Sequence, residues 1–177
     1  MKYKLLVLDI DGTVTNSKKE ISEKTKEAII HLQERGIPVA IASGRPPQGT
    51  SYVAEKLEFQ RFGSYIMPFN GARILNFKTK ECVYSKTLPP RLPGKLWRDA
   101  LQYGAGIITY HGDEIIAGTC PDKYMDIEAK INGIPVVYHE DFGTYVDFPV
   151  NKCLMTGEPE DLEALEPVFA QKYMHEA

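Results

Sequence analysis

The sequence predicts an α/β protein in which a parallel-sheet core is followed by a second, α+β segment. Two short apolar runs, residues 5–8 and 38–42, flank a stretch with helical spacing. A strand, a helix and a second strand over this length form a βαβ unit, so the two strands are expected to be parallel neighbours. From about residue 88 the pattern changes to hairpins and helices, which predicts a separate domain.

The first strand and the first helix have clear signals. Four consecutive apolar residues at positions 5–8 predict a strand that is buried on both faces, and Gly12 is expected to stop it. Ser22 then offers an N-cap to a helix, and Gly36 is expected to close that helix. The second apolar run follows directly and completes the βαβ unit.

A third strand and a hairpin are expected next. Residues 64–67 read as a strand, after a weaker helical stretch. The Asn70-Gly71 pair is a strong turn signal, with strands expected at residues 72–75 and 82–84.

The second half of the chain begins with a stiff, proline-rich connection at residues 88–93, which is typical of a domain crossing. We therefore expect one domain in residues 1–86 and another in residues 87–177. Three helices and several short strands are expected in the second domain, and Pro159 opens the last helix. The apolar helix positions are Leu96, Trp97, Ala100 and Leu101, then Tyr124, Ile127 and Ile131, then Leu162, Leu165 and Phe169.

An acidic pair follows the first strand. Asp9 and Asp11 are separated by one residue, so both side chains leave on the same side if the extended geometry continues. Open α/β sheets hold their ligands at the carboxyl ends of their strands. Two carboxylates there can act as nucleophile, as general acid and base, or as ligands of a divalent metal. An Asp-x-Asp-Gly sequence is also a common turn, and from this stretch alone both interpretations stay open.

The second strand ends in donors that suit an anion. Ser43, Gly44 and Arg45 follow it, and parallel neighbours end at the same edge of a sheet. A hydroxyl, a backbone N–H and a guanidinium are then expected beside the acidic pair, where they suit a phosphoryl group. The alternative is a strand-to-helix turn with a capping serine. The backbone at Asn70, after the third strand, is a further candidate for this edge.

Composition excludes several classes of protein. The 177 residues carry a formal charge of −3, which gives no support for binding to nucleic acid or to an anionic membrane. The three cysteines lie far apart without a C-x-x-C pair, which argues against a disulfide framework or a zinc site and favours a reducing compartment. No stretch approaches transmembrane length, and we expect a cytoplasmic protein.

Three segments together resemble the haloacid dehalogenase superfamily: Asp9-Ile10-Asp11-Gly12-Thr13, Ala42-Ser43-Gly44-Arg45 and Asn70-Gly71-Ala72. They look most like its sugar-phosphatase branch, in which a large α/β cap is inserted after the third core strand. The resemblance implies a Rossmann-like parallel-sheet core in residues 1–86 and an inserted α+β cap domain, here incomplete, in residues 87–177.

The resemblance also implies a role for each matched residue. Asp9 is expected to attack phosphorus and become an aspartyl phosphate, while Asp11 protonates the leaving alcohol and then activates water. Mg²⁺ is expected between the Asp9 carboxylate, Asp11 and the phosphate of a small phosphorylated metabolite, such as a sugar phosphate. The residues expected to bind that substrate are Ser43, Gly44, Arg45 and Asn70.

Two later motifs of the superfamily, a lysine and a G-D-x-x-N-D sequence, have no match. Lys152 lies within the cap pattern, and Gly112-Asp113-Glu114 lacks the Asn-Asp pair. The chain therefore resembles the first two thirds of such an enzyme, and we expect these residues alone to bind Mg²⁺ poorly and to turn over slowly. The alternative is a truncated or degenerate module that binds phosphate or metal without catalysis. A phospho-receiver domain is a weaker third interpretation.

Overall fold

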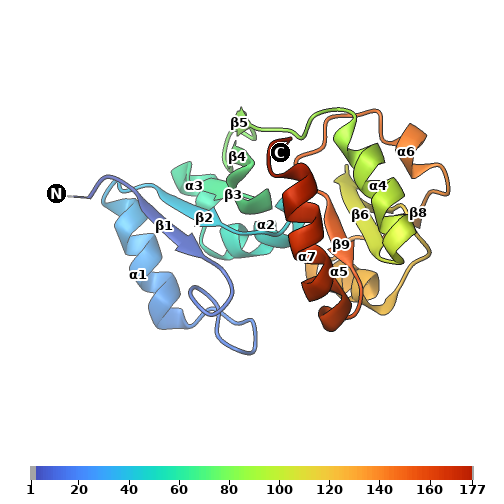
Figure 1. Ribbon diagram of the computed structural model, residues 1–177. Helices are drawn as coiled ribbons and strands as arrows, with labels where there is room; N and C mark the ends of the chain where they lie inside the picture. The colour runs from blue at the N-terminus through green and yellow to red at the C-terminus, as the bar shows by residue number, and fades with distance from the viewer. Residues whose placement is uncertain (1–2, 177) are drawn as a thin grey trace. The chain divides into compact units, whose positions relative to one another are not determined.

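The computed structural model describes residues 3–176 and divides the chain into two compact units, residues 1–86 and 87–177 (Figure 1). Each unit has its own sheet and its own buried apolar residues. No helix in the described part of the chain is both long and apolar enough to cross a membrane.

The first unit is built on a five-stranded sheet in the order β1-β2-β3-β4-β5. Asp9 pairs with Ala42, and Ala42 pairs with Met67, so the three parallel strands end at the same level. This confirms the predicted α/β class and places the three strand ends side by side. The strands are β1 (Leu6–Asp9), β2 (Val39–Ala42) and β3 (Tyr65–Met67), which are parallel, and β4 (Arg73–Asn76) and β5 (Cys82–Ser85), which continue antiparallel.

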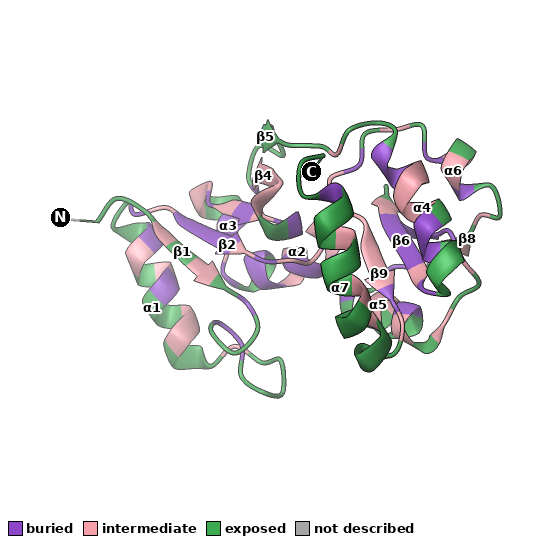
Figure 2. Ribbon diagram, viewed as in Figure 1, coloured by how far each residue is buried: buried purple, intermediate pink, exposed green. Residues whose placement is uncertain are grey.

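The helices of this unit cover one face of the sheet. Helix α1 (Glu23–Glu34) joins β1 to β2, and its predicted N-cap is confirmed, because the Ser22 side chain accepts a hydrogen bond from the Thr25 N–H. Helices α2 (Pro47–Lys56) and α3 (Phe59–Phe62) join β2 to β3. Residues of α1, α2, β2 and β3 share a single buried cluster, drawn in purple in Figure 2, so α1 and α2 lie on the same face.

The opposite face of β1 differs from the prediction. Leu5 and Val7 are 49% and 48% exposed, so the predicted burial on both faces is wrong. The reason is that β1 is an edge strand, and within residues 3–176 helices pack against only one of its faces. The strand also ends at Asp9, before the glycine that was expected to stop it.

A buried chain of hydrogen bonds ties α1 to the sheet. The Ser64 hydroxyl donates to Gln33 Oε1 at 2.6 Å and accepts from the Val39 N–H at 3.1 Å. Gln33 Nε2 donates in turn to the Leu57 carbonyl at 2.8 Å. Gln33 and Ser64 are both buried, so each depends on the other to replace the hydrogen bonds of water.

The second unit has a four-stranded sheet in the order β8-β7-β6-β9. Strands β6 (Gly106–His111) and β7 (Glu114–Ala117) form the predicted hairpin. Strand β8 (Val136–Tyr138) is parallel to β7, and β9 (Leu154–Thr156) is antiparallel to β6. This mixture of parallel and antiparallel pairs agrees with the α+β pattern read from the sequence.

Helices lie on both faces of this second sheet. Ile115 packs with residues of α5 (Lys123–Asn132), whereas its neighbour Ile116 packs with Trp97 of α4 (Leu92–Tyr103) and Phe142 of α6 (Phe142–Tyr145). Adjacent strand residues face opposite sides, so β7 contributes to both clusters. The last helix, α7 (Pro159–Tyr173), begins at the predicted proline.

Helix α5 presents a different face from the one predicted, and α4 departs from its predicted face at Leu101. In α5 the buried positions are Met125 and Asn132, while Ile127 and Ile131 are 51% and 46% exposed. In α4 the predicted apolar residue Leu101 is 51% exposed. An apolar residue at helical spacing does not by itself identify the buried side, because its neighbours at the next positions compete for the same core.

The buried charged residue of α4 explains part of this difference. Asp99 is only 7% exposed, and it accepts a hydrogen bond from the Tyr173 hydroxyl at 2.6 Å. The Lys172 ammonium also lies 2.6 Å from its carboxylate. These contacts connect the last turn of α7 to α4, and Tyr173 is the buried residue of α7.

The buried hydrogen-bond chain makes a first prediction. Ser64→Ala removes the partner of both Gln33 Oε1 and the Val39 N–H, so it is expected to lower the free energy of unfolding by about 2–3 kcal/mol. Ser17→Ala, at an exposed serine of a turn, is the matched control and is expected to change it by less than about 0.5 kcal/mol. Urea denaturation measures both, and equal effects would contradict the assigned role.

Asp99 makes a second prediction, on pH. Desolvation raises its pKa, but the hydrogen bonds and charge of Lys172 and Tyr173 outweigh this and hold the pKa below its ordinary value of 3.8. Because the folded pKa is depressed, the ionised carboxylate stabilises the fold above the ordinary value, and this stabilisation is lost as pH falls through the folded pKa. The stability lost in Asp99→Asn, measured by denaturation, is therefore expected to shrink between about pH 5 and about pH 2. A loss that stays constant over that range contradicts the assignment.

Candidate functional site

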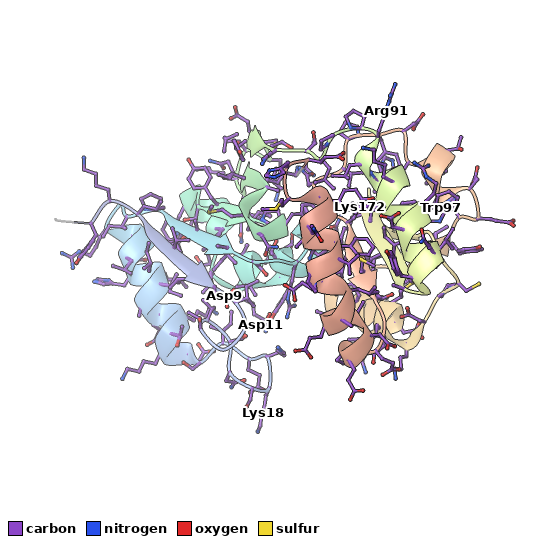
Figure 3. All side chains as sticks on the ribbon, in the orientation of Figure 1. Asp9, Asp11, Lys18, Arg91, Trp97 and Lys172 are labelled. Carbon is purple, nitrogen blue, oxygen red and sulfur yellow. The ribbon has the colours of Figure 1, made fainter. Side chains whose placement is uncertain are left out.

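The acidic pair stands at the carboxyl end of β1. Asp9 is the last residue of the strand, and Asp11 lies two residues beyond it; both are exposed, while Ile10 between them is fully buried (Figure 3). A tight turn follows, in which the Thr15 N–H donates to the Ile10 carbonyl at 2.9 Å and the Gly12 N–H donates to the Thr15 carbonyl at 3.1 Å. The turn and the paired carboxylates therefore coexist.

The segments after β2 and β3 are joined by backbone hydrogen bonds. The Ser43 N–H donates to the Met67 carbonyl at 3.1 Å, and the Asn70 N–H donates to the Ser43 carbonyl at 2.9 Å. Phe69 donates in the same way to the Arg45 carbonyl at 3.0 Å. These bonds hold the four predicted substrate-binding residues in one neighbourhood at the edge where β1 also ends.

The turn at Asn70 is more specialised than a simple hairpin. Phe69, Asn70 and Gly71 all have positive φ, at 56°, 57° and 84°. Asparagine and glycine tolerate this left-handed conformation better than other residues. The Asn70 carboxamide faces Gly44, since a Cβ atom on Gly44 would lie 2.9 Å from Asn70 Oδ1. A glycine at position 44 is what permits this close approach.

The Arg45 side chain contacts Asp11 of the acidic pair. Its Nη2 lies 2.8 Å from Asp11 Oδ1 and 2.9 Å from Oδ2, and its Nε lies 3.2 Å from Oδ2. The Arg45 side chain is only 13% exposed, whereas the Asp11 side chain is 41% exposed, so water reaches this forked contact from the side of the carboxylate. The structure thus brings together residues that are 34 positions apart in the sequence.

A second cation also contacts Asp11. Lys19 Nζ lies 2.6 Å from Asp11 Oδ1. Partial burial raises the pKa of Asp11, but the hydrogen bonds and charges of Lys19 and Arg45 outweigh it and place the pKa below the ordinary value of 3.8. Lys19 was not among the predicted site residues. An asparagine-led turn at residues 16–20 was the available signal, but spacing alone does not say where its lysines point.

Two oxygen-bearing groups of the acidic pair have no hydrogen-bond or ion-pair partner within residues 3–176. The Asp9 carboxylate makes no hydrogen bond or ion pair, and the main-chain carbonyl of Asp11 accepts no hydrogen bond. Mg²⁺ takes one or two carboxylates, with water and substrate phosphate as its other ligands. The described residues contain no group of three or more acidic, histidine or cysteine side chains that could hold a metal by themselves. The donor set therefore fits a metal shared with a phosphorylated ligand.

Comparisons with known proteins give the chain its relatives. Residues 6–177 match the model of the haloacid dehalogenase-like hydrolase family. A haloacid dehalogenase-like hydrolase from Bacteroides thetaiotaomicron superposes with a TM-score of 0.90 at 39% identity, over 99% of this chain and 66% of that one. A subclass IIB sugar phosphatase of the same superfamily has the same fold, with a TM-score of 0.69 at 22% identity, over 93% of this chain and 63% of that one.

Sequence relatives agree with the structural ones. A protein of Streptococcus pyogenes, whose name as a phosphatase is provisional, is 27% identical over 166 residues, which are 93% of this chain and 61% of that protein. A Bacillus subtilis protein, which is also provisionally named a phosphatase, is 31% identical over 86 residues, which are 49% of this chain and 32% of that protein. The chain thus spans less than two thirds of the length of each of these relatives.

The contact between Gly44 and Asn70 can be tested by a double-mutant cycle. Gly44→Ala forces its Cβ against the Asn70 carboxamide and is expected to cost about 1–2 kcal/mol of stability, in the range of overpacking elsewhere. Asn70→Gly removes the carboxamide and keeps the left-handed backbone accessible. In that background Gly44→Ala is expected to cost less than half as much, as measured by urea denaturation. Additive effects of the two substitutions would show that the residues do not interact.

Proposed function

Because the chain belongs to the haloacid dehalogenase-like hydrolases, as its three motifs predict, we propose that it provides the nucleophile of a Mg²⁺-dependent phosphatase of small phosphorylated metabolites. The observation that carries this proposal is the contrast within the acidic pair. Asp9 has an exposed carboxylate without a partner among residues 3–176, whereas Asp11 is held by Arg45 and Lys19. Sugar phosphates are the first substrates to test, since a structural neighbour is named as a sugar phosphatase.

The proposed reaction has two displacements at phosphorus. A carboxylate oxygen of Asp9 forms a bond to phosphorus while the bond from phosphorus to the alcohol oxygen breaks. Asp11, which must first take up a proton because Lys19 and Arg45 favour its ionised form, donates that proton to the alcohol oxygen. A water molecule then attacks the aspartyl phosphate, giving its proton to Asp11 and releasing inorganic phosphate and the Asp9 carboxylate. The sum is hydrolysis of one monoester by one water, with both side chains restored.

Charge is the main obstacle to the first step, because a carboxylate repels a phosphate dianion. The Asp9 carboxylate and the Asp11 carbonyl are the proposed ligands of Mg²⁺, which would neutralise part of this charge when bound. The Ser43 hydroxyl oxygen accepts a hydrogen bond from the Arg45 N–H at 3.2 Å. The hydroxyl proton of Ser43 can therefore be donated to a phosphate oxygen. Aimed donors of this kind act most strongly on charge that develops in the transition state.

The wider setting of the site stays a prediction. The second unit, residues 87–177, is proposed to belong to a cap domain, because it follows the β-hairpin of the core and has a sheet of its own. A cytoplasmic location is also proposed from the composition.

The nucleophile is tested by Asp9→Asn. An amide cannot attack phosphorus in place of a carboxylate, so hydrolysis of p-nitrophenyl phosphate and of sugar phosphates is expected to fall by about 10³-fold or more. Asp126→Asn, at an exposed aspartate of α5, is the matched control and is expected to keep its activity. Circular dichroism checks that both variants fold. Undiminished turnover in Asp9→Asn would overturn the assignment.

A further inference from the structure

Lys19 lies outside every motif that indicated the site, yet it makes one of the shortest contacts there. Its ammonium is 2.6 Å from Asp11 Oδ1, on the carboxylate that Arg45 also holds. The two cations differ in freedom, because the side chain of Lys19 is 59% exposed and that of Arg45 only 13% exposed. Arg45 is fixed by a forked contact, whereas Lys19 is a point charge on a flexible stem.

Hydrogen bonds within residues 16–20 fix the conformation of the loop that carries Lys19. Asn16 Oδ1 accepts hydrogen bonds from the N–H groups of Lys18 at 2.8 Å and Glu20 at 3.0 Å. The Asn16 N–H donates to the Glu20 carbonyl, and the Lys19 N–H donates to the Asn16 carbonyl, both at 2.9 Å. These bonds hold Lys19 at a φ of 62°, a conformation that lysine seldom adopts. Such an outlier persists only where the surrounding structure enforces it.

Neighbouring Lys18 gives a contrast within the same loop. Figure 3 shows its side chain at the far end of the loop from Asp9 and Asp11. Both lysines carry the same charge and both are exposed, so the turn alone separates the one that reaches the acidic pair from the one that does not.

The charges of the site show why Lys19 matters for a ligand. Asp9, Asp11, Lys19 and Arg45 form a set with two negative and two positive charges, and both positive charges lie on Asp11. A phosphoryl dianion that binds beside Asp9 adds two negative charges where no cation of this set lies. The exposed and flexible ammonium of Lys19 is the positive charge that can follow the ligand with the least rearrangement.

We propose that Lys19 is a phosphate-binding residue of this site, which rests on Asp11 when the site is empty and moves onto a phosphoryl oxygen when a phosphate ion or monoester binds. The proposal rests on the proposed function, because it takes Asp9 as the place where the phosphoryl group binds. It adds a residue from a loop that the three motifs do not include.

Binding of inorganic phosphate in the presence of Mg²⁺, measured by isothermal titration calorimetry, tests the proposal. Lys19→Ala is expected to weaken the affinity about tenfold, since a charge-assisted hydrogen bond to the phosphate is lost. Lys19→Arg is expected to recover most of the affinity. Lys18→Ala is the matched control and is expected to change it by less than about twofold, because the effect of a distant exposed charge is screened by salt.

A second background separates direct binding from a purely structural role. In Asp11→Asn the charged partner of Lys19 is gone, so a lysine that served only to hold Asp11 has nothing left to hold. If Lys19 contacts the phosphate, the double variant Asp11→Asn/Lys19→Ala is expected to bind phosphate about tenfold more weakly than Asp11→Asn alone. An unchanged affinity in the double variant, or in Lys19→Ala alone, would overturn the proposal.

The failure of this proposal differs from the failure of the proposed function. If Asp9→Asn abolishes hydrolysis while Lys19→Ala binds phosphate as well as the unsubstituted protein does, only the role of Lys19 is lost. If Asp9→Asn keeps its activity, the nucleophile is wrong whatever Lys19 does. Absence of phosphate binding by the unsubstituted protein counts against both.

Discussion

The parallel pairing of three strands is the constraint on which the rest of the site depends. Asp9, Ala42 and Met67 stand at the same level of β1, β2 and β3, so the segments that follow them emerge at one edge of the sheet. Backbone hydrogen bonds then join these segments, as between Asn70 and Ser43. A shift of one residue in either pairing would move these segments relative to one another and turn alternate side chains to the other face.

The two aspartates have different electrostatic surroundings, because both neighbouring cations lie on Asp11. Both are exposed carboxylates with one residue between them, and the family resemblance alone predicted different roles for them. In the fold Arg45 and Lys19 both contact Asp11, and within residues 3–176 neither contacts Asp9. A carboxylate without a partner keeps its lone pairs for a metal or for phosphorus, while its neighbour is held in position. This difference arises from a loop and from a second strand, not from the acidic motif itself.

Burial was the least predictable property. The apolar run of β1 identified a strand, but Val7 lies exposed because β1 is at the edge of its sheet and, within residues 3–176, helices pack against only one of its faces. Ile127 and Ile131 identified a helix, but Met125 and Asn132 occupy its buried side. The local sequence pattern shows which residues favour burial. Whether those residues are buried depends on the packing of residues far away in the sequence. Asp99, a charged residue, is buried because Tyr173 and Lys172 reach it across 74 and 73 positions.

The sequence alone determined the family, the α/β class, the order of strands and helices in the first half and the six residues proposed for the site, because short motifs and turn signals act over a few neighbouring residues. Only the tertiary structure decided that Arg45 binds Asp11, that Asn70 requires glycine at position 44, and that Lys19 belongs to the same cluster. These contacts depend on side-chain direction and on loop geometry, which the spacing of residues leaves open. Position 19 shows this well, since a single turn built on Asn16 separates it from an equally charged neighbour.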